Sequence, residues 1–130
     1  MIRGYLLVLL VTLPGLVYAC ELEGAHQKEL ESGEMLYHRV KKPPLTVARH
    51  FSMQFRLCRH GAPVTVRRFK LDAVMPAHNH GMNYRAKIDI GAEGLIEASG
   101  LLFHMPGRWR LIVDFATDAA IHQVKLDYQI

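Results

Sequence analysis

Histidine and methionine residues gather in two short segments of this sequence, and each segment contains a Met-Pro pair. The first segment runs from Met75 to Met82, and the second is His104-Met105-Pro106-Gly107. Thioether sulfur and imidazole nitrogen form a soft to borderline ligand set, which favours copper over magnesium or calcium because those hard ions prefer oxygen. Zinc more often takes thiolate, imidazole or carboxylate ligands. The sequence therefore predicts a copper site, with the ligand set Met75, His78, His80, Met82, His104 and Met105.

The same residues also fit a structural interpretation without metal. Met75 and Met82 can fill the open end of a sandwich as flexible apolar side chains, and His104 can donate to a loop carbonyl. The His78-Asn79-His80 spacing favours the metal if the segment is extended, because side chains two residues apart lie on the same side of a strand. The two interpretations differ in whether the imidazoles converge.

The elements that must position these residues are strands. After Gly33 the apolar residues alternate with a period of two, which is typical of strands with one buried face. Pro43-Pro44, His60 to Pro63 and Gly91 to Gly94 separate the alternating runs. We expect an all-β fold over residues 34–130, an antiparallel immunoglobulin-like β-sandwich of about seven strands. The expected strands cover residues 35–40, 51–58, 66–74, 83–90, 95–103, 109–115 and 124–128.

Chain direction brings the two Met-Pro segments together in this prediction. If each connection after Val66 reverses the chain, two reversals separate the loop at 75–82 from the turn at 104–106. Both segments then lie at the same end of the sandwich, where their side chains can share one site.

The first residues have the pattern of a signal peptide. Arg3 precedes an apolar run from Tyr5 to Leu13, which the Pro14-Gly15 pair interrupts. A transmembrane helix needs about 20 uninterrupted apolar residues, so we expect residues 1–19 to be removed after Ala19. The mature chain then has no stable transmembrane segment, and we expect it in the periplasm or cell envelope. Residues 20–33 are charged, and we expect a tail outside the core with a helical turn around residues 25–30.

The chain has two cysteines, Cys20 and Cys58. In an oxidising compartment an even number of cysteines favours pairing, so a Cys20–Cys58 disulfide is predicted. Cys58 falls on the outward face of its strand, where the N-terminal tail can reach it. In the alternative interpretation residues 17–20 are a lipobox and Cys20 carries a lipid anchor, which would leave Cys58 as a free thiol.

Several classes of function find no support in the sequence. The net charge of +4 comes from scattered basic residues, so nucleic acid is not an expected partner. No serine lies in a nucleophile-elbow pattern, and both thiols are expected to be bonded; we therefore do not expect an enzyme. The other histidines lie singly and are expected in surface or turn positions: His26, His38, His50, His60 and His122.

Two blocks of sequence resemble the YtkA-like family, which is related to FixH-type proteins. They are DAVMPAHNHGMNY (residues 72–84) and GLLFHMPGRW (residues 100–109), the second continuing into LIVDF. The resemblance implies an immunoglobulin-like domain exposed in the cell envelope, with copper handling and respiratory-oxidase assembly as the inferred functions. The FixH type keeps a transmembrane helix, whereas this chain has the pattern of a cleavable signal.

The combined prediction is an exported copper-binding protein, either a periplasmic copper chaperone or a respiratory-oxidase assembly factor. Its partner would be an envelope or membrane protein that receives the copper. The alternative is a metal-free structural or protein-interaction module of the envelope, which would use the same end of the sandwich or an exposed sheet edge.

Overall fold

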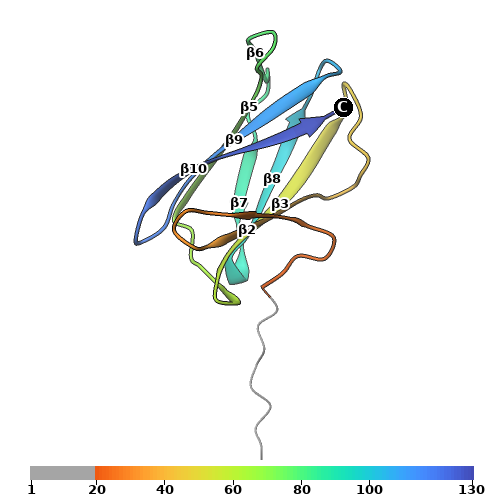
Figure 1. The fold of residues 1–130 in the computed structure, drawn as a ribbon. Helices are drawn as coiled ribbons and strands as arrows, with labels where there is room; N and C mark the ends of the chain where they lie inside the picture. The colour runs from red at the N-terminus through yellow and green to blue at the C-terminus, as the bar shows by residue number, and fades with distance from the viewer. Residues whose placement is uncertain (1–19) are drawn as a thin grey trace, which may run out of the picture.

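Two antiparallel sheets face each other across a shared apolar core (Figure 1). The structure is a computed structural model that describes residues 20–130, so the predicted signal segment 1–19 lies outside the described residues. The larger sheet has the order β1-β2-β3-β8-β7, with β4 beside β3, and the smaller sheet has the order β10-β9-β5-β6. The predicted all-β sandwich is confirmed.

The strand bounds follow the alternating runs of the sequence, except that residues 83–86, which were expected to be strand, are irregular and β7 begins at Lys87. The larger sheet consists of β1 (His26–Glu29), β2 (Met35–Val40), β3 (His50–Arg59), β4 (Ala62–Pro63), β7 (Lys87–Ile90) and β8 (Leu95–Leu102). The smaller sheet consists of β5 (Arg68–Met75), β6 (His80–Gly81), β9 (Arg108–Ala116) and β10 (Ile121–Gln129). Within residues 20–130 the one helical element is a 3-10 turn, η1 (Ala92–Gly94). The order β2-β3-β8-β7 opposite β5-β9-β10 is that of an immunoglobulin constant-type domain.

The centre of the core lies between β3 and β9. Every second side chain of these strands points between the sheets, and burial of one large apolar side chain stabilises the fold by about 1.5–3 kcal/mol. The fully buried residues of β3 and β9 are those that the alternation in the sequence predicts to face inward. The fully buried residues of the two strands include Met53, Phe55, Leu57, Trp109, Leu111 and Val113.

The N-terminal segment is part of the fold. The expected helical turn around residues 25–30 is wrong, because His26–Glu29 forms strand β1 and pairs antiparallel with β2. Leu30, which follows β1, is 8% exposed and belongs to the main core. All four side chains of β1 are exposed, so the segment has no apolar alternation; the unpaired edge of β2 specifies the strand instead.

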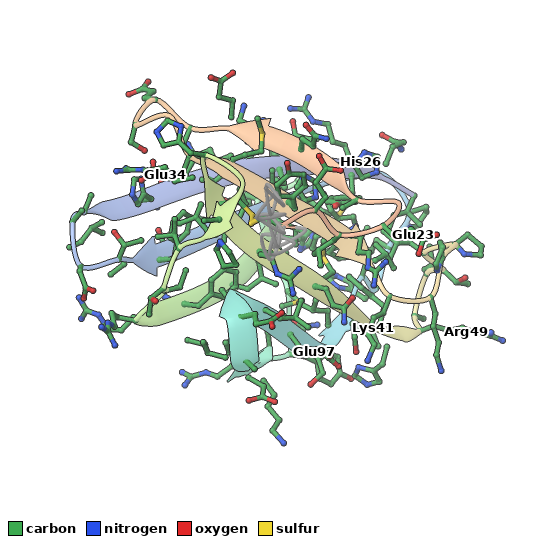
Figure 2. All side chains as sticks on the ribbon, turned by 90° about the horizontal axis from the view of Figure 1, so that it is seen from below. Glu23, His26, Glu34, Lys41, Arg49 and Glu97 are labelled. Carbon is green, nitrogen blue, oxygen red and sulfur yellow. A yellow bond between two sulfur atoms is a disulfide. The ribbon has the colours of Figure 1, made fainter. Side chains whose placement is uncertain are left out.

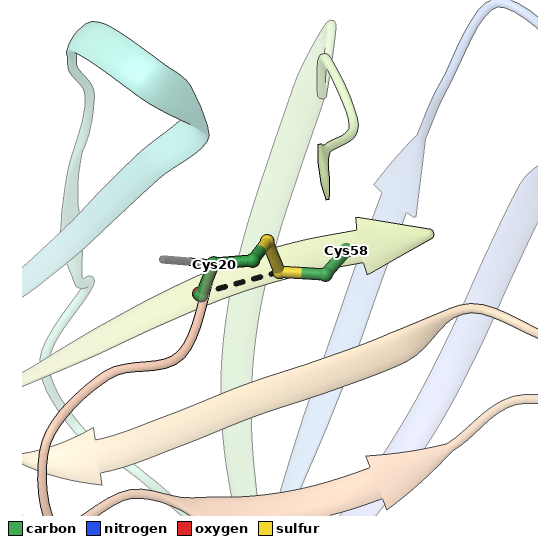
Figure 3. Close-up of a disulfide and its surroundings, with 2 residues drawn as sticks. All are labelled: Cys20 and Cys58. Atoms are coloured by element: carbon green, nitrogen blue, oxygen red, sulfur yellow. Dashed lines mark hydrogen bonds between the residues drawn. A yellow bond between two sulfur atoms is a disulfide. The ribbon is translucent and has the colours of Figure 1, made fainter. Parts of the chain in front are cut away.

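A disulfide fastens this segment to the outer face of β3 (Figure 3). Cys20 and Cys58 are bonded, with their Cα atoms 6.1 Å apart, as the sequence predicts. Cys58 faces away from the main core, yet it is only 3% exposed because the segment covers it. With Leu22 and Tyr37, the two cysteines form a second, smaller apolar cluster.

Polar contacts continue across the outer face of the larger sheet. Arg39 donates to the Glu23 carbonyl oxygen at 2.5 Å and to Gln54 Oε1 at 2.9 Å. Lys41 Nζ lies 2.8 Å from Glu97 Oε1, and Figure 2 shows the two side chains next to each other. Segment 20–34 is therefore held by a covalent bond, a strand pairing and hydrogen bonds.

Candidate metal site

Both Met-Pro segments lie at one end of the sandwich. β5 ends at Met75 and β9 begins at Arg108, and these strands pair antiparallel with Val74 opposite Arg110. The loop after β5 and the turn before β9 are therefore neighbours, near the upper end of the molecule in Figure 1. The expectation from chain direction is confirmed.

The first segment is a hairpin rather than an extended run. Residues 76–79 form a turn, after which β6 pairs back on β5 with His80 opposite Met75. Asn79 has a φ of 51°, a left-handed conformation that asparagine tolerates better than most residues. The extended geometry assumed for the His78-Asn79-His80 spacing is therefore wrong.

Three imidazole rings nevertheless lie in a row. The centre of the His80 ring is 6.1 Å from that of His78 and 6.1 Å from that of His104. A metal–nitrogen bond of about 2.1 Å puts the centre of a ligating ring about 3.2 Å from the ion, so two rings on one ion lie no more than about 6.4 Å apart. Both ring pairs fall within this limit, and His80 is the member common to both.

His104 has an unsatisfied ring nitrogen. Its Nδ1 atom is buried and has no hydrogen-bond partner among residues 20–130. One edge of the ring meets Trp109, with the ring centres 5.3 Å apart. A buried polar atom without a partner costs about 1–3 kcal/mol, so the site would gain stability from a ligand at this nitrogen. This orphaned atom fits a metal ligand.

The three methionines have different environments. Met75 is 2% exposed and belongs to the main core, as in the structural interpretation of that residue. Met82 and Met105 are partly buried and pack against the core. The Met105 carbonyl accepts a hydrogen bond of 2.9 Å from Trp109 Nε1, which ties the turn to β9.

The histidines do not form a complete site by themselves. Within residues 20–130 no group of three or more His, Cys, Asp or Glu side chains is placed to hold a metal ion. A metal bound at this end would therefore need thioether or water ligands in addition to two imidazoles. The candidate pair is His80 and His104, with Met82 and Met105 as the candidate thioethers.

His38 corrects one sequence expectation. It was expected on the surface, but it is 7% exposed, and its Nδ1 lies 2.7 Å from the Tyr128 hydroxyl. Burial lowers the pKa of His38 to about 4, helped by the nearby His26, and burial raises the pKa of Tyr128 to about 12. The signal was present in the sequence, because His38 is two residues from Leu36 and thus shares its inward face.

Comparison with known proteins supports the fold alone. Neither known protein families nor curated proteins give a match to this sequence. Among solved structures, the chain is similar to a DUF4426 family protein from Pseudomonas aeruginosa PAO1, with a TM-score of 0.61 and 7% identity. The match covers 82% of this chain and 94% of that one. Separately, the part of the chain from residue 20 onward contains no helix of the length and apolarity that a membrane crossing requires.

Proposed function

We propose that the protein is an exported copper-binding protein that holds Cu(I) between His80 and His104. The supporting observation is the 6.1 Å separation of their ring centres, with one buried nitrogen of His104 unpaired. A tetrahedral ion such as zinc would draw two ligating rings to about 5.2 Å. The separation of 6.1 Å corresponds to an N–metal–N angle of about 145°, which leaves room for a third ligand on Cu(I). A thioether from Met82 or Met105 would complete a soft ligand set.

The disulfide supports export. A Cys20–Cys58 bond persists in an oxidising compartment, which agrees with the predicted signal segment and with a location in the periplasm or cell envelope. Lipidation of Cys20 would consume the thiol that bonds Cys58, so we favour a cleaved form without a lipid anchor.

The exposure of the site supports a role in copper transfer. His78 and His80 are both exposed on the hairpin, so a partner can approach the ion from solvent. The motif resemblance to the YtkA-like family adds copper handling and oxidase assembly as the biological setting. We therefore propose a copper chaperone that passes the ion to an envelope or membrane protein and catalyses no reaction.

Metal content tests this proposal. The protein would be isolated from the periplasm, incubated anaerobically with Cu(I), desalted and subjected to elemental analysis. The His80→Ala/His104→Ala variant should lose the copper that the parent retains. His60→Asn is the matched control, because His60 is exposed in the turn between β3 and β4 and asparagine tolerates its φ of 50°. Copper retained by the double variant, or absent from the parent, would exclude the site.

A further inference from the structure

A groove runs along the free edge of β5, on the side away from β9. It has a volume of about 620 Å³ and lies between β5 and residues 82–88, which cross from the smaller sheet to the larger. Its lining includes Lys70, Leu71, Met82, Tyr84, Arg85 and Ile88. The groove thus lies between an edge of the smaller sheet and an edge of the larger sheet.

The backbone of β5 offers unpaired groups to this groove. β9 pairs with β5 over residues 68–74, whereas β6 pairs only with Val74 and Met75. The Ala73 carbonyl accepts from Met82 N at 2.9 Å and so points toward β6. Backbone groups of a strand alternate between its two sides, so those of Phe69 and Leu71 point the same way as Ala73. No strand within residues 20–130 pairs with them there.

The side chains of the groove combine an apolar floor with walls that carry two cations, Lys70 and Arg85, and one carboxylate, Asp72. Met82, Ala86 and Ile88 are partly buried and pack against the core. Lys70 and Arg85 are exposed on opposite sides of the groove, and neither belongs to an ion pair within the described residues. The Asp72 carboxylate accepts a hydrogen bond of 2.8 Å from Ala73 N, and the walls keep an excess of one positive charge. A ligand that complements this surface alternates apolar side chains with carboxylates placed at Lys70 and Arg85.

We propose that this groove binds an extended segment of a partner protein, which adds to β5 as a further strand. Main-chain hydrogen bonds to Phe69 and Leu71 would supply affinity, as in other cases of strand addition. Side chains of a strand alternate between its faces, so apolar residues would meet the floor while carboxylates meet Lys70 and Arg85. This inference does not rest on copper binding, although Met82 belongs to both the groove and the hairpin of the candidate metal site.

A peptide-binding measurement tests this groove. The probe is a fluorescent nine-residue peptide in which valine and glutamate alternate, and its affinity is followed by fluorescence anisotropy. The expected result is binding that weakens at least about fivefold for the Lys70→Glu/Arg85→Glu variant, because two attractive charge pairs become repulsive. Two control peptides should bind the parent protein as weakly as the probe binds the variant. One alternates valine with lysine, and the other is the valine–glutamate peptide with every second amide N-methylated. Circular dichroism confirms that the variant is folded.

Lys28→Glu/Lys125→Glu is the matched control. These two lysines are exposed along the groove between β1 and β10, at the other open side of the sandwich, and their reversal should leave peptide affinity unchanged. Equal losses for the two double variants, equal binding of the lysine peptide, or no binding at all would overturn the proposal. So would a dimer in analytical ultracentrifugation that Lys70→Glu abolishes, because a second copy would then occupy the edge.

Discussion

His80 and His104 lie with ring centres 6.1 Å apart and ring planes at 89°, although the first follows β5 and the second follows β8. β5 belongs to the smaller sheet and β8 to the larger. An ion held between these rings would therefore connect the two sheets at one end of the sandwich. The contact depends on the even number of chain reversals that separates the two Met-Pro segments.

Copper at His104 should quench the fluorescence of Trp109. This is the only tryptophan of the chain, and its ring centre is 5.3 Å from that of His104, within the range at which Cu(II) quenches an excited indole. We expect saturable quenching on titration with Cu(II), and we expect His104→Ala to abolish it. Quenching of the same depth and midpoint in the variant would mean that copper binds elsewhere.

His38 should make the folded protein less stable as the pH is lowered. Its pKa in the folded protein is lowered to about 4, whereas the unfolded chain titrates near about 6.5. Between these values the unfolded chain binds more protons, so this contribution is complete above about pH 6.5 and is lost as the pH falls toward 4. After allowance for partial solvent screening, we expect a loss of about 2 kcal/mol in the free energy of unfolding across this window.

Urea unfolding at several pH values measures this dependence. His38→Gln should remove most of the slope between about pH 4 and 6.5. Tyr128→Phe should retain the slope. That change removes the hydroxyl that contacts His38 but leaves the His38 imidazole buried. If His38→Gln unfolds with the pH dependence of the parent, another group carries the effect.

The Cys20–Cys58 bond should be present in the exported protein and should stabilise it. The mass of the mature chain should be lower than that of the reduced form by two protons. The Cys20→Ser/Cys58→Ser variant should lose about 2–4 kcal/mol of unfolding free energy, because the bond restrains the unfolded chain over a separation of 38 residues. A diacylglyceryl adduct on Cys20 would instead establish the lipidated form.

Gly107 should resist substitution because of Met75. A Cβ atom at Gly107 would lie 2.8 Å from Met75 Cε, and the Gly107 φ of +130° disfavours other residues. We expect Gly107→Ala to cost about 1–3 kcal/mol in unfolding free energy. Adding Met75→Ala removes the clashing methyl group, so the two changes should couple by at least about 0.5 kcal/mol in chemical denaturation. Strict additivity would show that the two segments pack independently.

Sequence reasoning predicted the parts of the fold that depend on periodicity. Burial in β3 and β9 follows the alternation of residues such as Phe55 and Trp109, because a half-buried strand needs a period of two. To predict that His80 and His104 lie at the same end of the sandwich, the directions of the strands were the only further information needed.

The parts that sequence reasoning missed depend on neighbours in space. β1 has four exposed residues, and it is a strand because the edge of β2 is available to it. The turn at Asn79 has a local signal, because asparagine tolerates its φ of 51°, but the pairing of β6 with β5 that closes the hairpin depends on a neighbouring strand. Met75, a candidate ligand in the sequence analysis, is 2% exposed in the core, and its methyl group lies against the turn at Gly107.

The most direct test of the copper proposal is an anaerobic Cu(I) titration against a chromophoric competitor. It would compare the parent with His80→Ala, His104→Ala and the His60→Asn control. We predict that the parent and the control share one affinity, and that each of the other variants binds at least about tenfold more weakly, a loss of about 1.4 kcal/mol or more. If His80→Ala and His104→Ala bind Cu(I) as tightly as the parent, the two rings do not hold the ion.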